Sequence, residues 1–195
     1  AAGYLHRDIK PGNVMIGPYG ETLVVDWGLA KTVTLPDAEG SFDLGYRPVN
    51  LDDREVSIEG QVKGTPAFMS PEQAHGQTDL LGPRTDIYAL GAMLHMLLTG
   101  KTLYPGRTAT EIVYELRLRE PTLNPDHEPL PKALLSVCRK AMARTPDDRY
   151  ESAQQIADDL EHWLADEPVS VYRDGISTRT RRWVKNHRTL VASTA

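Results

Sequence analysis

Residues 84–99 are apolar on almost every side. Isoleucine and leucine recur there at the spacing of one helix face, and small residues between them leave little polar surface on the rest. The face is formed by Ile87, Leu90, Leu94, Leu97 and Leu98. Gly100 follows directly and suits the end of a helix. Because a helix that is hydrophobic all round has to be covered by other elements, we expect this one to be buried.

Three further helices and one hairpin are expected beside this helix. Residues 108–111 and 152–155 match the capping box that opens a helix, and residues 132–143 carry an apolar stripe at helical spacing. Short apolar runs at 14–17 and 22–25 flank a Gly-Pro-Tyr-Gly turn, which predicts a β-hairpin. The predicted fold class is therefore mainly α, with a small β-hairpin near the start of the chain.

The composition excludes several classes of protein. With 40% hydrophobic and 25% charged residues, the chain has the proportions of a globular protein rather than of a fibrous or disordered one. Its single cysteine, Cys138, excludes a disulfide scaffold, and its place on an apolar helix face predicts a core residue. Four histidines without metal-ligand spacing are expected to pack or to lie at the surface. They are His75, His95, His127 and His162.

Charge is distributed unevenly along the chain, whose net charge is -5. Residues 169–195 hold six basic residues and one acidic residue, so the rest of the chain is strongly acidic. An acidic body lacks the basic face that nucleic-acid binding needs, and we expect no nucleic-acid partner. The basic segment is a separate element, for which a solvated terminal helix is the alternative interpretation.

Two polar motifs flank the predicted hairpin. His-Arg-Asp-Ile-Lys-Pro-Gly-Asn occupies residues 6–13, and Asp-Trp-Gly occupies residues 26–28. The spacing of Asp8 and Asn13 lets a loop turn back and present both side chains to one point. A carboxylate near a hydroxyl nucleophile, with an amide oxygen and the carboxylate of Asp26 on a metal ion, is what phosphoryl transfer requires.

These motifs and three others resemble the eukaryotic-type (Hanks-type) serine/threonine protein kinases of bacteria. The others are Gly-Thr-Pro-Ala-Phe-Met-Ser-Pro-Glu at 64–72, Asp-Ile-Tyr-Ala-Leu-Gly at 86–91, and Arg149. All five follow in the family's order, so the resemblance is specific. It implies phosphorylation of serine or threonine on protein substrates, with ATP and Mg²⁺ as cofactors. The alternatives are a pseudokinase that serves as a scaffold or docking module, and a small-molecule phosphotransferase.

The resemblance assigns roles to the polar residues. Asp8 would orient the substrate hydroxyl and accept its proton, and Lys10 would contact the transferring phosphate. Asn13 and Asp26 would hold magnesium ions beside the nucleotide. Thr65 would hydrogen-bond to Asp8 and Lys10 and shape the platform for the protein substrate.

Further motif residues are implied to support this site. Glu72 and Arg149 would form a buried ion pair, and Asp86 would tie the buried helix to the backbone of the catalytic loop. Met15 would lie under the adenine ring, although a plain core position is the alternative. The remaining structural residues of the motifs are His6, Arg7, Trp27 and Gly28.

The chain departs from the family pattern in four ways, of which a small one is Ser70-Pro71-Glu72 in place of Ala-Pro-Glu. Trp27 stands where phenylalanine is usual, and the segment from Asp26 to Glu72 is long at 47 residues. Only five residues precede His6, so the Gly-rich loop and the strand lysine of the N-terminal lobe are absent. We therefore expect a C-terminal lobe alone at 1–165, followed by a basic juxtamembrane segment at 166–195.

Two expectations concern regulation and location. Arg7 beside Asp8 is typical of kinases whose activation segment is held by a phosphate, and Ser57 is the preferred acceptor. The other candidates are Thr32, Thr34 and Ser41. Glu55 and Glu59 could instead supply a permanent negative charge to Arg7 in place of a phosphate.

Residues 181–188 interleave basic residues with tryptophan ahead of an apolar run at 189–195. That order predicts a cytoplasmic kinase domain anchored by a single membrane helix that begins there; a basic amphipathic helix on a soluble protein is the alternative.

Overall fold

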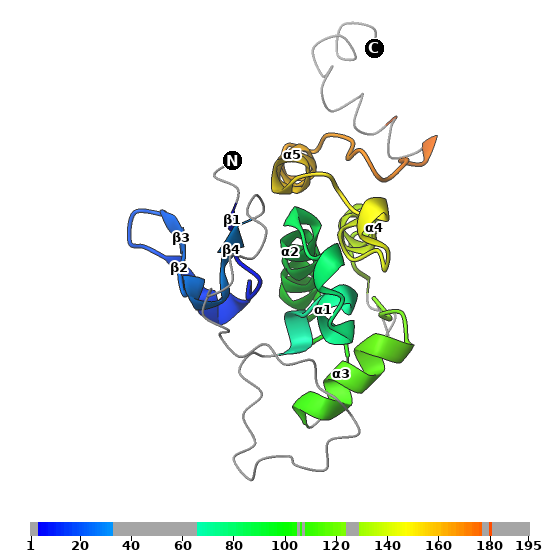
Figure 1. Cartoon of the computed structure of the whole chain (residues 1–195). Coiled ribbons are helices and arrows are strands. Elements are labelled where there is room, and N and C mark those ends of the chain that lie inside the picture. Colours follow the sequence, from blue (N-terminus) through cyan, green and yellow to red (C-terminus); the bar gives the residue numbers. More distant parts are fainter. Residues whose placement is uncertain are drawn as a thin grey trace, which may run out of the picture.

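The computed structural model describes residues 4–32, 66–104, 106, 108–123, 129–176 and 180. Figure 1 shows short strands on one side of a larger group of helices, which surround α2. The strands are β1 (Tyr4–Leu5), β2 (Val14–Ile16), β3 (Thr22–Val24) and β4 (Lys31–Thr32). The helices are α1 (Pro71–His75), α2 (Pro83–Thr99), α3 (Ala109–Leu118), α4 (Lys132–Ala141) and α5 (Ala153–Leu164). The predicted mainly helical fold with a small antiparallel hairpin is therefore confirmed.

The central helix α2 is buried along most of its length, as its pattern predicts. Ile87, Tyr88 and Ala92 are at most 2% exposed and belong to two neighbouring apolar clusters. Gly91 allows α4 to approach closely, because a Cβ at this position would lie 2.7 Å from the Cβ of Ala141. α2 therefore forms the core against which the other helices pack.

The last turn of α2 differs from the prediction. Leu97, which the helical pattern puts on the buried face, is 78% exposed. The last buried residue of the helix is His95, and the helix ends at Gly100 in the left-handed conformation. Met96 and Leu98 of the same turn are partly buried against the core, so the packed elements cover only part of the apolar face there and leave Leu97 outside.

The flanking helices begin where the sequence predicts. The side chain of Thr108 accepts a hydrogen bond from the backbone N–H of Glu111 at the start of α3, and that of Ser152 accepts one from Gln155 at the start of α5. On α4 the predicted stripe is buried. It consists of Leu134, Val137, Cys138, Ala141 and the following Met142. The apolar pattern of α5 overestimates burial at its end, since Leu164 is 76% exposed.

The strands form two antiparallel pairs. The predicted hairpin joins β2 and β3, with Met15 opposite Leu23. The second pair, β1 with β4, was not predicted from the sequence, because two-residue strands carry no alternation that a pattern could reveal. This second pair returns the chain after the hairpin to the residues that precede His6.

Several predicted features lie outside the described residues. They include Thr65, Ser57, Thr34, Ser41, His127 and the basic run at 181–188. Among the helices that the structure does describe, none has the length and apolar character needed to cross a membrane.

Candidate active site

The loop of residues 6–13 is closed by hydrogen bonds between its own polar side chains. The amide nitrogen of Asn13 donates to the backbone oxygen of Asp8 at 2.8 Å and to its carboxylate oxygen Oδ2 at 3.1 Å. Lys10 Nζ donates to the same oxygen at 2.7 Å. The structure therefore brings Asp8 and Asn13 together, as their spacing predicts, and places Lys10 with them.

The segment after the hairpin is held against this loop through the ring of His6. Nδ1 of His6 accepts from the Asp8 N–H at 3.3 Å, so Nε2 carries the proton and donates to the Val25 backbone oxygen at 3.0 Å. The Val25 N–H donates to the Asn13 backbone oxygen at 2.9 Å. The Trp27 ring packs edge-on against His6, with ring centroids 4.8 Å apart. These contacts hold Val25 and Trp27, the two neighbours of Asp26 in the chain, against Asn13 and His6.

Two backbone positions at the site adopt an unusual conformation. Arg7 and Asp26 have φ angles of 68° and 63°, in the left-handed region that residues other than glycine rarely adopt. Of the described residues, only Asp166 shares this property without being a glycine. Such strain persists where surrounding contacts enforce it, and it is frequent at functional sites.

The oxygen atoms available at the site suit a magnesium ion. Both hydrogen bonds of the Asn13 side chain use its nitrogen, which leaves the amide oxygen for a ligand. The Asp26 side chain is exposed, and a Cβ at Gly28 would lie 3.2 Å from its Oδ1, so glycine keeps that side open. Mg²⁺ prefers such hard oxygen ligands and is usually bound by one or two protein groups together with substrate phosphates.

Asp86, near the start of α2, fixes the backbone of the 6–13 loop. Its two carboxylate oxygens accept from the N–H groups of His6 and Arg7, each at 2.8 Å. Burial raises the pKa of Asp86 above its usual value, although the two N–H donors oppose that shift. The predicted tie between the buried helix and this loop is therefore present.

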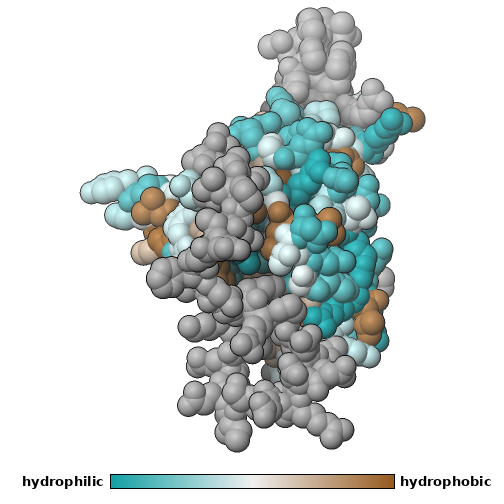
Figure 2. Space-filling model, viewed as in Figure 1, coloured by the Kyte–Doolittle hydropathy of each residue, from teal (hydrophilic) through white to brown (hydrophobic). Residues whose placement is uncertain are grey.

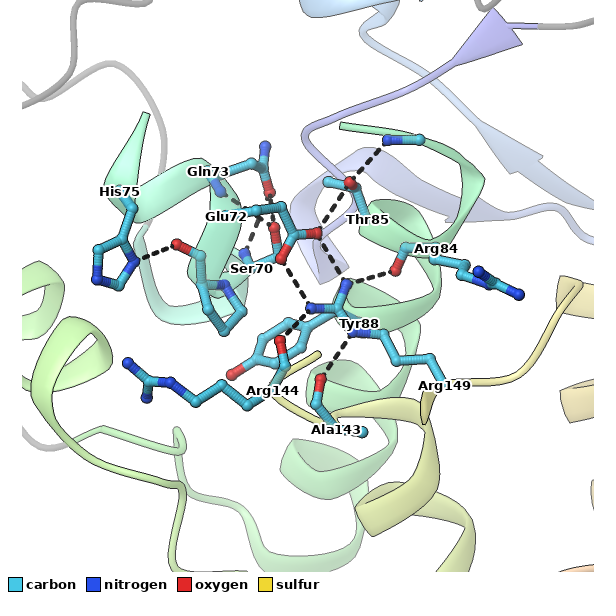
Figure 3. A network of polar contacts seen from close by, with 12 residues as sticks. Ser70, Glu72, Gln73, His75, Arg84, Thr85, Tyr88, Ala143, Arg144 and Arg149 are labelled. Carbon is cyan, nitrogen blue, oxygen red and sulfur yellow. Dashed lines mark hydrogen bonds and ion pairs between the residues drawn. The ribbon is translucent and has the colours of Figure 1, made fainter. Parts of the chain in front are cut away.

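The predicted ion pair between Glu72 and Arg149 is also present and is fully enclosed. Two guanidinium nitrogens of Arg149 donate to the two carboxylate oxygens of Glu72 at 2.8 and 2.7 Å, and each residue is 2% exposed (Figure 3). Thr85 donates to Glu72 as well, at 3.0 Å. Burial alone would raise the pKa of Glu72, but the hydrogen bonds and charge of Arg149 outweigh it and lower the pKa.

Arg149 is further held by backbone oxygens and by an aromatic ring. It donates to the backbone oxygens of Arg84, Ala143 and Arg144, at 2.7 to 3.2 Å. Its guanidinium carbon lies 5.0 Å from the centre of the Tyr88 ring. The pair therefore connects α1 and α2 to the segment between α4 and α5, with 77 positions between Glu72 and Arg149.

Met15 is not a core residue. It is 57% exposed, as is Leu23 opposite it on the hairpin, and Figure 2 shows apolar surface in this part of the molecule. Met15 is thus accessible from outside, and the alternative of a buried packing residue is wrong.

The histidines and the cysteine behave as predicted where they are described. His75 and His162 are exposed. His95 is buried, with Nε2 at 2.9 Å from the Leu123 backbone oxygen, and burial lowers its pKa. Cys138 is fully buried, and burial raises the pKa of its thiol to about 12, so it is an unreactive core residue.

Sequence reasoning missed Ser70, Gln73 and Thr85, all of which are buried polar residues around Glu72. A signal for two of them exists, because Ser70 and Gln73 have the spacing of a capping box. That box is formed: the Ser70 hydroxyl accepts from the Gln73 N–H, and the Gln73 side-chain oxygen accepts from the Ser70 N–H at 3.1 Å.

Comparison with known proteins decides the family. The model of the protein kinase domain matches residues 1–162. The chain belongs to the protein kinase family. A serine/threonine-protein kinase PknD of Chlamydia muridarum is 32% identical over 98% of this chain and 21% of its own length. One of Protochlamydia amoebophila is 36% identical over 83% of this chain and 16% of its own. The resemblance to bacterial serine/threonine kinases is confirmed, and this kinase chain spans about a fifth of the length of those relatives.

Proposed function

We propose that the protein transfers the γ-phosphate of ATP to serine or threonine residues of other proteins. The observation that carries this proposal is the contact of Asp8 with both Lys10 and Asn13, together with the backbone hydrogen bond from Val25, the residue before Asp26, to Asn13. Kinase chemistry depends on positioning and on charge neutralisation rather than on covalent catalysis, and these four side chains provide the means for both.

In this proposal Asp8 orients the hydroxyl of the substrate and accepts its proton. Its Oδ2 is already bonded to Lys10 and Asn13, so Oδ1 is the oxygen that would meet the hydroxyl. Lys10, whose Nζ donates to Oδ2 of Asp8, would bind the transferring phosphate. Asn13 and Asp26 would hold Mg²⁺, which when bound neutralises charge on the phosphates of ATP.

We further propose that residues 1–165 form a C-terminal kinase lobe, to which a separate N-terminal lobe would contribute the rest of the nucleotide cleft. The exposed pair of Met15 and Leu23 supports this, because an adenine ring covered by such a lobe would bury both. Nucleotide affinity is the test. The full-length protein should bind ATP more tightly than residues 1–165 alone, and equal affinity would contradict the proposal.

The basic segment of residues 166–195 is proposed to lead to a membrane anchor, with the kinase lobe in the cytoplasm. The sequence of residues 181–188, where basic residues flank a tryptophan, supports this. Fractionation of cells that express the full-length protein would test it, and activity found wholly in the soluble fraction would contradict the anchor.

Ser57 remains the proposed phosphate acceptor of the activation segment. Mass spectrometry of the active protein should detect a phosphate on it.

The function itself is tested by Asp8→Asn in the full-length protein. The substitution removes the proton acceptor at nearly constant volume, so transfer of radiolabelled phosphate from ATP to a generic basic protein should be lost while the fold is retained. Asp79→Asn is the matched control, because Asp79 is exposed in a turn away from these contacts. Undiminished transfer in Asp8→Asn would contradict the assignment.

A further inference from the structure

Gln73 is a buried residue of α1 that contacts the loop bearing Asp8. It is 5% exposed, and its side-chain nitrogen donates to the backbone oxygen of Arg7 at 2.9 Å. The two residues are 66 positions apart in the chain. This hydrogen bond therefore joins the helix that carries Glu72 to the peptide group between Arg7 and Asp8.

The orientation of the Gln73 amide is fixed by its partners. At one end its oxygen accepts from the backbone N–H of Ser70 at 3.1 Å, and an N–H can only donate. At the other end its nitrogen faces the Arg7 carbonyl, which can only accept. A glutamine satisfies both partners at once, whereas a carboxylate would satisfy only the Ser70 end.

Gln73 binds the carbonyl of a residue whose backbone is strained. Arg7 has a φ of 68°, so its backbone is in a conformation that other contacts have to maintain. Asp86 binds the N–H on one side of Arg7, and Gln73 binds the carbonyl on the other. Rotation of this residue would turn the following peptide and change the direction of the Asp8 side chain.

We propose that Gln73 is a positioning residue for phosphoryl transfer, acting through the Arg7 carbonyl to keep the Asp8 carboxylate in its reactive direction. This inference rests on the proposed function, because it concerns the efficiency of the same site. It assigns to the Glu72 helix a second role besides the ion pair: it supports the 6–13 loop directly.

Two substitutions of Gln73 in the full-length protein distinguish the effect of losing the hydrogen-bond donor from the effect of adding a charge. Gln73→Glu keeps the shape and the acceptor for Ser70, and Gln73→Met keeps the length without charge. Both remove the donor to Arg7, so both should lower kcat at least about tenfold while the KM for ATP is unchanged. Gln77→Glu and Gln77→Met are matched controls, because Gln77 is exposed just beyond α1. They should retain wild-type kcat.

Thermal unfolding and hydrogen exchange complete the test. At a temperature where each variant is folded, deuterium uptake in peptides covering residues 6–13 should rise for both Gln73 variants and not for the Gln77 variants. Wild-type uptake and wild-type kcat in the Gln73 variants would overturn the inference, as would a loss of activity that only follows the unfolded fraction. If the wild-type protein transfers no phosphate, the proposed function fails, and the uptake result alone decides whether Gln73 holds the loop.

Discussion

The polar groups of residues 4–32 and those around Glu72 are organised differently. The Glu72–Arg149 pair is enclosed, and Arg149 donates to both carboxylate oxygens of Glu72 and to three backbone oxygens. Around Asp8 the hydrogen bonds gather on one carboxylate oxygen, and Asp26 is exposed. The first arrangement suits stability and the second suits chemistry, because a group that reacts has to keep a position free for a ligand.

The largest expected effect separates these two regions most clearly. Asp26→Asn keeps the volume of the side chain and tolerates the left-handed backbone at this position. It removes a charge proposed to hold Mg²⁺, whose neutralisation of the phosphates the reaction depends on, so most phosphoryl transfer should be lost. The melting temperature should stay at the wild-type value, because the side chain is exposed. A variant that unfolds early but keeps its rate would reverse the assignment.

Substitution in the Glu72–Arg149 ion pair should mainly lower the stability of the fold. Arg149→Met leaves the Glu72 carboxylate buried without its partner, and breaking such a pair costs about 3–5 kcal/mol. Denaturant unfolding measures this loss. Exchanging the charges with Glu72→Arg and Arg149→Glu should recover only part of it, because the three backbone oxygens bound by Arg149 would then face a carboxylate.

A second arginine provides the control for that experiment. Arg84 pairs with Asp147 at the surface, where their side chains are 33% and 86% exposed. Exposed pairs contribute about 0–1 kcal/mol, so Arg84→Met should change the unfolding free energy by that amount or less. Equal losses for Arg84→Met and Arg149→Met would mean that enclosure of the pair is not what matters.

Much of this contrast is predictable from the sequence, and the unpredicted part has a physical cause. The buried α2, the capped helices and the hairpin follow from periodicity and caps within a dozen residues. The pairing of Glu72 with Arg149 came from the family resemblance rather than from any local pattern. Gln73 was missed because a buried polar residue is recognised by its partners, and its partner Arg7 lies 66 positions away. Leu97 was misassigned because a helical pattern does not show how much of an apolar face the neighbouring elements cover.

The pH dependence of stability should differ in sign between two carboxylates. The pKa of Glu72 is lowered by Arg149, so its contribution is present above about pH 4.3, the unfolded value, and is lost as the pH falls through the lower folded pKa. The pKa of Asp86 is raised by burial, so the folded state takes up its proton first and its contribution grows as the pH falls.

Unfolding free energies measured across the acid range test this difference. Glu72→Gln should flatten the loss of stability on acidification, and Asp86→Asn should steepen it. The comparison is made between the two slopes, because each substitution also removes hydrogen bonds that shift the whole curve. Slopes that change in the same direction for both variants would contradict the opposite signs.

The smallest expected effect concerns a third carboxylate, that of Asp159. It is buried like Glu72, but the hydrogen-bond donors described for it carry no charge. Asp159 is 2% exposed and accepts from the hydroxyl of Tyr150 at 2.6 Å, and from the N–H and hydroxyl of Ser170 at 2.6 and 2.8 Å. Ser170→Ala removes one of these three bonds at an exposed residue, so water can replace it, and the unfolding free energy should fall by about 0.5–1.5 kcal/mol.

Two further variants provide the comparison. Tyr150→Phe removes a donor that is 2% exposed, where water cannot easily replace it, and should lower the unfolding free energy more than Ser170→Ala. Ser136→Ala, which removes an exposed hydroxyl bonded only within α4, should cost less than either. If Ser170→Ala lowered the unfolding free energy as much as Arg149→Met, the charge of the partner would not explain the larger loss expected for the Glu72 pair.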